Sequence, residues 1–90
     1  MAAIEPSRIA AKILDMLSAR PLGATICPSD AARSLAPDDE AAWRALMPEV
    51  RRVADDLKAQ GLIRVMARGQ DIASAQDAHG PIRLGRPKAC

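Results

Sequence analysis

Residues 57–69 read LKAQGLIRVMARG, and the order of the structural signals in them is the most specific indication of the fold class. The first four residues end a helical pattern, and Gly61 is the residue type best able to adopt the left-handed conformation that closes a helix. Ile63, Val65 and Ala67 then alternate with Leu62, Arg64 and Met66, which is typical of a strand. Residues 68–71 form the predicted turn that follows. The stretch therefore predicts a helix, a strand and a tight turn in immediate succession.

The chain before this stretch is mostly helical in its pattern. An apolar stripe at helical spacing predicts a helix over residues 6–19, with Pro6 in the first turn. The stripe consists of Ile9, Ile13, Met16 and Leu17. A very short strand is expected at residues 25–26. A second, short helix begins at residues 28–30, whose serine and aspartate suit a helix start, and ends before Pro37.

Pro48 divides the next apolar segment. Its ring is expected to clash with the carbonyl of Arg44, which disfavours a single straight helix over residues 40–60. We therefore expect a short helix over 40–46 that carries Trp43, and a longer one over 48–60. Val50, Val53, Ala54 and Leu57 form the buried stripe of the longer helix.

The order of these elements is that of a winged helix-turn-helix domain. Residues 82–84 alternate again and can return as a second strand beside residues 62–67. The prediction is a mainly α fold with a small β-hairpin: three to four helices and a two- to three-stranded antiparallel sheet. Residues 6–84 form this single domain, with tails at 1–5 and 85–90.

Three blocks of sequence resemble a known family. They are ATICPSDAARSL (24–35), WRALMPEVRRVADDLKAQGLI (43–63) and GPIRL (80–84), in which ICPS, WRxLMP and GPIRL are the distinctive motifs. The blocks resemble a small bacterial family of winged-helix-like domains of unknown function. The resemblance implies the winged-helix fold and implies no activity.

Composition and charge narrow the function. The chain has 90 residues and a formal net charge of +2, distributed unevenly. Residues 1–40 carry four basic and six acidic side chains, and residues 41–90 carry nine and five, so the second half favours an anionic partner. No apolar run reaches the ~18–20 residues that span a bilayer, and no signal segment is visible, so a cytoplasmic protein without a membrane partner is expected.

The sequence contains no recognisable catalytic or metal site. Cys27 and Cys90 are far apart in sequence, and His79 is the single histidine. Neither a zinc-ligand spacing nor a nucleophile with a base and an orienting group can be assembled from them. Cys27 at a helix start is either a reactive thiol or a packing residue. We expect no cofactor, no metal and no enzymatic activity.

The basic half suggests a nucleic-acid interface. In DNA-binding winged helices the last helix enters the major groove, and the wing contacts the backbone or the minor groove. Arg51 and Arg52 on the helix over 48–60 are the candidates for contacts to base edges. The candidates for phosphate contacts are Lys58, Arg64, Arg68 and Arg83.

Each of these assignments has an alternative. Arg51 and Arg52 precede Asp55 and Asp56 by four residues, and such pairs on a helix form ion pairs that leave no net charge. Arginines on the strands could instead protect an exposed sheet edge. Trp43 is either an interface anchor or the packing centre of an otherwise aliphatic core.

Two functions therefore remain open. The first is a small DNA-binding protein, such as a transcriptional regulator, that contacts double-stranded DNA. The alternative is a protein-interaction module that does not bind DNA. A monomer or a weak homodimer is expected in both cases.

Overall fold

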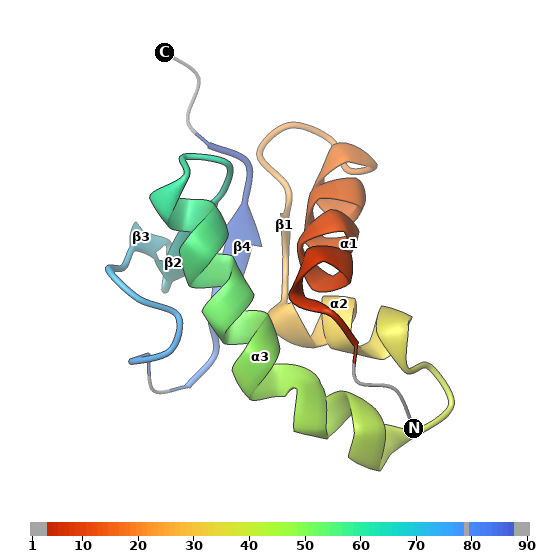
Figure 1. Cartoon of the computed structure of the whole chain (residues 1–90). Coiled ribbons are helices and arrows are strands. Elements are labelled where there is room, and N and C mark those ends of the chain that lie inside the picture. The colour runs from red at the N-terminus through yellow and green to blue at the C-terminus, as the bar shows by residue number, and fades with distance from the viewer. Residues whose placement is uncertain (1–3, 79, 88–90) are drawn as a thin grey trace.

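The computed structural model of the chain describes residues 4–78 and 80–87, so His79 and Cys90 lie outside the described residues. Figure 1 shows three helices and a small antiparallel sheet. The helices are α1 (Pro6–Ser18), α2 (Pro28–Leu35) and α3 (Glu40–Ala59). The strands are β1 (Thr25–Ile26), β2 (Arg64–Ala67), β3 (Gln70–Asp71) and β4 (Arg83–Gly85). This arrangement is compatible with a winged-helix fold.

The first two helices confirm the predicted pattern. Pro6 begins α1, and its apolar stripe is buried in the core through Ile9, Ile13 and Leu17. At the start of α2 the backbone N–H of Cys27 donates to the carboxylate of Asp30 over 2.9 Å. This bond fixes the direction in which the chain enters α2.

The prediction of two helices separated at Pro48 is wrong, because α3 is a single helix of 20 residues. Pro48 removes only one backbone donor, and its ring is exposed to solvent. The apolar side chains before and after it, including Trp43 and Val53, pack against the same core. Burial of both halves thus outweighs the local cost of the proline. Figure 1 shows that α3 accommodates it by changing direction along its length.

The predicted end of α3 is confirmed. Gly61 has a φ of 76° and its N–H donates to the carbonyl of Lys58 over 2.9 Å. The N–H of Leu62 donates to the carbonyl of Leu57 over 3.0 Å. These two bonds form the usual left-handed closure of a helix, and they turn the chain directly into β2.

The sheet has four strands in the order β1-β4-β2-β3, one more than predicted. The turn is narrower than residues 68–71: Gln70 and Asp71 pair back onto Ala67 and Met66 as β3, which leaves only Arg68 and Gly69 in the turn. The remaining residues 72–82 form the β3–β4 loop. The predicted return strand exists as β4, and it lies between β1 and β2.

The core lies between the helices and one face of the sheet. Val65 and Leu84 are opposite each other across β2 and β4, and both are fully buried. Alternation along the strands places Arg64 and Arg83 on the other face, which points away from the helices. Among the described residues, no helix combines the length and the apolar character needed to cross a bilayer.

Candidate nucleic-acid interface

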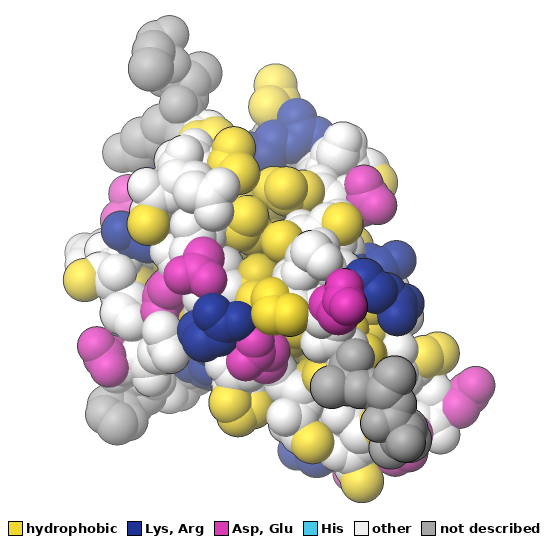
Figure 2. All heavy atoms as spheres, in the orientation of Figure 1, with side chains coloured by type: hydrophobic (Ala, Val, Ile, Leu, Met, Phe, Trp, Pro, Cys, Tyr) yellow, Lys and Arg dark blue, Asp and Glu magenta, His cyan; other side chains and the backbone are white. Residues whose placement is uncertain are grey.

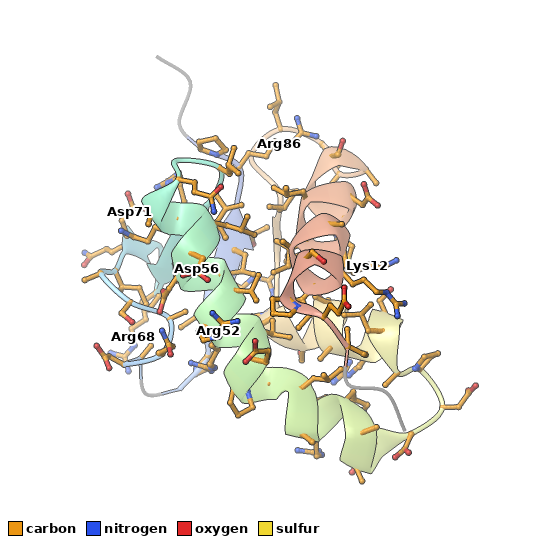
Figure 3. All side chains as sticks on the ribbon, viewed as in Figure 1. Lys12, Arg52, Asp56, Arg68, Asp71 and Arg86 are labelled. Carbon is orange, nitrogen blue, oxygen red and sulfur yellow. The ribbon has the colours of Figure 1, made fainter. Side chains whose placement is uncertain are left out.

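The outer face of α3 carries an ion-pair cluster around Arg52. The guanidinium donates to Asp56 over 3.1 Å, which confirms this predicted pair, and it also donates to both carboxylate oxygens of Glu49. The hydrogen bond from Arg52 lowers the pKa of Glu49 below its ordinary value. Figure 3 shows Arg52 and Asp56 side by side on α3. One arginine between two carboxylates gives this part of the helix a net negative charge.

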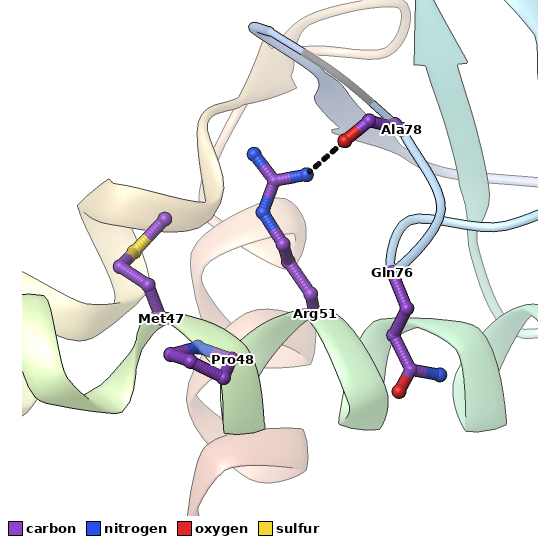
Figure 4. A pocket seen from close by; sticks show the side chains of 5 residues that line it. All are labelled: Met47, Pro48, Arg51, Gln76 and Ala78. Atoms are coloured by element: carbon purple, nitrogen blue, oxygen red, sulfur yellow. Dashed lines mark hydrogen bonds between the residues drawn. The ribbon is translucent and has the colours of Figure 1, made fainter.

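Arg51 faces the β3–β4 loop. Its Nη1 donates to the carbonyl oxygens of Ala75 over 2.9 Å and Ala78 over 3.4 Å, and its Nη2 donates to the carbonyl of Gly80 over 3.4 Å. Figure 4 shows the side chain reaching from α3 to the loop. The predicted ion pair with Asp55 is therefore wrong, because the loop carbonyls lie within reach of the guanidinium and take its place.

Asp55 holds the same loop from the other side. Its carboxylate accepts hydrogen bonds from Ser74 Oγ over 2.8 Å, the Ala75 N–H over 2.6 Å, and the N–H and side-chain amide of Gln76 over 3.2 and 3.0 Å. Partial burial raises the pKa of Asp55, but the hydrogen bonds together lower it by more than burial raises it. The pKa of Asp55 therefore lies below its ordinary value. We call Arg51 and Asp55 the loop clamp.

Lys58 is the third basic residue of α3 that the sequence predicts to contact nucleic acid. The residue is half-buried, and its side chain makes no hydrogen bond or ion pair with any described residue. Figure 2 shows basic and acidic side chains mixed on the visible face of the molecule, without a continuous basic area among the described residues.

Arg64 and Arg83 lie on the outer face of the sheet. Arg64 donates through Nε and Nη2 to Asp71 over 3.0 and 2.7 Å. Arg83 donates through Nε to the hydroxyl of Thr25 over 2.8 Å and through Nη2 to its carbonyl over 3.0 Å. In both arginines Nη1 makes no hydrogen bond within the described residues. Each guanidinium is thus fixed through Nε and Nη2, and its Nη1 remains available as a donor.

Arg68 occupies the tip of the β2–β3 hairpin. It is exposed, and neither a hydrogen bond nor an ion pair joins it to another described residue. Its φ is 54° and that of Gly69 is 80°, so both turn residues are left-handed, as a two-residue type I′ hairpin turn requires. Arginine is unusual in this position, where asparagine or glycine is preferred. We call Arg64, Arg68 and Arg83 the basic wing.

The six predicted residues therefore do not form one surface. Arg51 and Arg52 are engaged on α3, whereas the basic wing lies on the far side of the sheet and at its hairpin tip. The sequence gives no local signal for this separation, because the clamp's partners lie 19 to 29 residues away along the chain.

Arg86 is a structural residue, although it falls within the predicted C-terminal tail over 85–90. Its guanidinium donates to the carbonyls of Leu17, Ser18 and Arg20 over 2.8 to 3.1 Å, at the end of α1 (Figure 3). It provides the positive charge that a helix C-terminus favours, and the last turn of α1 has no basic residue of its own. Gly85 in β4 and Arg86 thus belong to the folded part of the chain.

Trp43 is half-buried and packs against the core. The guanidinium carbons of Arg33 and Arg44 each lie 4.8 Å from the centre of its ring. Trp43 thus packs at the edge of the core, and two guanidinium groups flank its ring. This position combines features of a core packing residue and of a surface residue, the two roles predicted from the sequence.

Comparison with known proteins identifies a family. The family model described as "Protein of unknown function (DUF3253)" matches residues 6–87, which is nearly the whole described chain. No curated protein matches the sequence.

Proposed function

The chain belongs to the DUF3253 family of proteins of unknown function, and we propose that it binds double-stranded DNA through the basic wing and not through α3. The single observation that carries the proposal is the position of Arg68. The hairpin turn carries an arginine in a left-handed conformation that costs a non-glycine residue about 1 kcal/mol. Such a residue at an exposed tip, without internal partners in the described structure, favours a role in binding.

The electrostatics of the wing support the same surface. Its three arginines are accompanied by one carboxylate, Asp71, which pairs with Arg64. On α3, by contrast, Glu49 and Asp56 outnumber Arg52. Phosphates are attracted to the wing and repelled by the helix face.

The geometry of Arg64 and Arg83 supports contacts to phosphate. Both guanidinium groups are fixed by intramolecular bonds through Nε and Nη2, so less side-chain entropy is lost when Nη1 binds an anion. The two residues are diagonal neighbours across β2 and β4, where such a pairing places the backbone positions about 7–8 Å apart. Their guanidinium groups diverge from there, that of Arg64 toward Asp71 of β3 and that of Arg83 toward Thr25 of β1. Two fixed cations spread across one sheet face are suited to contact separate phosphates of the DNA backbone.

The residue composition favours a duplex over a single strand. Proteins that bind single strands stack bases on aromatic side chains. The whole sequence contains one aromatic residue, Trp43, which lies on α3 and not on the wing. Binding through backbone phosphates alone is expected to show little sequence preference and a steep dependence on salt.

The triple variant Arg64→Ala/Arg68→Ala/Arg83→Ala tests the proposal. Fluorescence anisotropy with a random-sequence duplex at ~50 and ~150 mM salt should show salt-sensitive binding by the wild type, weakened at least about tenfold in the variant. The control Arg8→Ala/Arg33→Ala/Arg44→Ala removes the same charge from the helices and should bind like the wild type. Equal losses in the two variants, or no binding at low salt, would overturn the proposal. Circular dichroism confirms that both variants are folded.

Arg68→Asn separates binding from stability. Asparagine suits the left-handed position, so the free energy of unfolding is expected to rise by about 0.5–1 kcal/mol. Binding to the duplex should weaken, and the slope of log K against log salt should fall by about one because one phosphate contact is lost. Urea unfolding and anisotropy on the same sample measure both effects. A variant that is more stable and binds DNA unchanged would contradict the role of Arg68.

A protein partner remains the second candidate, and one observation favours it. The mixed charges around Arg52 make the outer face of α3 a polar surface of the kind found at the rim of protein interfaces. Anisotropy distinguishes the two candidates, since a protein-interaction module would leave the duplex unbound at every salt concentration.

A further inference from the structure

A hollow of about 320 Å³ lies on the outer face of the sheet, beside the basic wing. Its floor includes Thr25 of β1, Gly85 of β4 and Met66 of β2, which are neighbours across the strands. The loop between α1 and β1 forms one wall through Leu22, Gly23 and Ala24. A space of this size is at the lower end of the range for small-ligand sites.

The floor of the hollow is tightly packed around Gly85. A Cβ atom at this position would lie 2.8 Å from the terminal methyl of Met66. Met66 therefore lies flat over the glycine and is only 8% exposed, although it is on the outer face of the sheet. This packing gives the hollow an apolar base that ordinary strand alternation does not predict.

The lining combines apolar and cationic groups. Leu22 is 82% exposed, the most exposed large apolar side chain of the described residues, and Pro87 adds a second apolar contact. Arg64 and Arg86 are its two cationic lining residues. Arg83 adjoins the hollow, since its guanidinium is bonded to the lining residue Thr25. None of the described lining residues is acidic, and the carboxylate of Asp71 holds the guanidinium of Arg64 at 2.7 Å, which leaves Nη1 of Arg64 available to an anion.

We propose that this hollow binds a nucleoside monophosphate unit, with the phosphate at Arg64 and the base against Leu22, Met66 and Pro87. The unit has a compact anionic group and a flat, weakly polar body, which match the two kinds of lining. The same chemistry can come from a free mononucleotide or from the terminal nucleotide of a strand. The strand-end source rests on the proposed function, because a duplex held at the wing would bring its end to the adjacent hollow.

Amide chemical shifts of the labelled protein test the site directly. Adenosine monophosphate should shift the amides of Gly23, Ala24 and Gly85, with a Kd on the order of 1 mM for so small an open site. Adenosine alone and inorganic phosphate alone should each bind at least about fivefold more weakly, because each lacks one half of the contacts. Equal binding of phosphate and the mononucleotide would overturn the apolar half of the proposal, and no shifts with any probe or strand end would overturn all of it.

Two duplex probes distinguish the source. A dumbbell duplex closed at both ends has no terminal nucleotide, whereas a duplex with a 5′-phosphorylated one-nucleotide overhang has one at each end. Tighter binding of the overhang duplex, with shifts in the hollow, supports the strand end as the source. Binding of the dumbbell without any shift by mononucleotide or overhang would overturn this inference and leave the proposed function standing. Binding of the mononucleotide without binding of the dumbbell would support this inference and overturn the proposed function.

Leu22→Ser is the matched variant, because an exposed side chain can be changed without affecting the fold. It should raise the Kd for the mononucleotide about fivefold through loss of apolar contact, and leave dumbbell binding unchanged. Leu62→Ser is the control: Leu62 is also exposed, at 42%, but it does not line the hollow. Equal Kd values for the two variants would place the ligand elsewhere.

Discussion

Asp55→Ala is expected to lower the free energy of unfolding by about 3 kcal/mol, the largest effect of any charged residue on α3. The carboxylate accepts four hydrogen bonds from Ser74, Ala75 and Gln76, and its loss leaves the part-buried N–H of Ala75 without a partner and frees the β3–β4 loop from α3. Urea unfolding at pH 7 measures the change. Asp56→Ala is the matched control: its side chain is 60% exposed with one ion pair, so its change should stay within about 0.5 kcal/mol.

The same residue predicts a pH dependence. The pKa of Asp55 is lower in the folded protein than in the unfolded chain, where it is about 3.9. Its contribution is therefore fully present above that value and is lost as the pH falls through the folded pKa. The wild type should lose stability below about pH 4 more steeply than Asp55→Ala does. Parallel curves for the two proteins would contradict this role of the carboxylate.

Arg86→Ala is expected to lower the free energy of unfolding by about 2 kcal/mol. One guanidinium satisfies three carbonyls at the end of α1, and these have no other basic partner in that turn. Arg86→Lys should recover little, because a single ammonium cannot reproduce the planar arrangement of donors. Thermal unfolding measures the loss. The control Arg20→Ala removes an exposed charge without a side-chain bond in the described structure, and a loss equal to that of Arg86→Ala would rule out the capping role.

The parts of the fold that depend on neighbouring residues were predictable from the sequence. Gly61, the stripe of α1 and the strand beginning near Ile63 all carry local signals, and the structure confirms them. Pro48 was misleading for a physical reason. A proline inside a helix loses one backbone hydrogen bond and its ring clashes with the carbonyl four residues earlier. These local costs are outweighed because the apolar side chains before and after Pro48 pack against the same core, which keeps α3 continuous.

The candidate site was predictable only in part. Charge and strand alternation identify Arg64 and Arg83 as residues of one sheet face, and the register agrees. The sequence could not reveal that Arg51 binds loop carbonyls or that Arg86 caps α1, because these partners are 24 to 69 residues away. A carbonyl has no side-chain signature, so a basic residue that binds only backbone looks identical to a free one.

The position of β4 has a consequence for the order in which the protein assembles. β4 lies between β1 and β2, so residues 25–26 and 64–67 are joined only when residues 83–85 are in place. Closing β1 onto β4 brings together residues about 60 positions apart, which is slow relative to helix formation. The helices and the β2–β3 hairpin can form early, whereas β1 must wait for β4. A fragment that stops before residue 83 would leave β1 unpaired and the buried faces of Ile26 and Val65 uncovered, and such intermediates are the ones that aggregate.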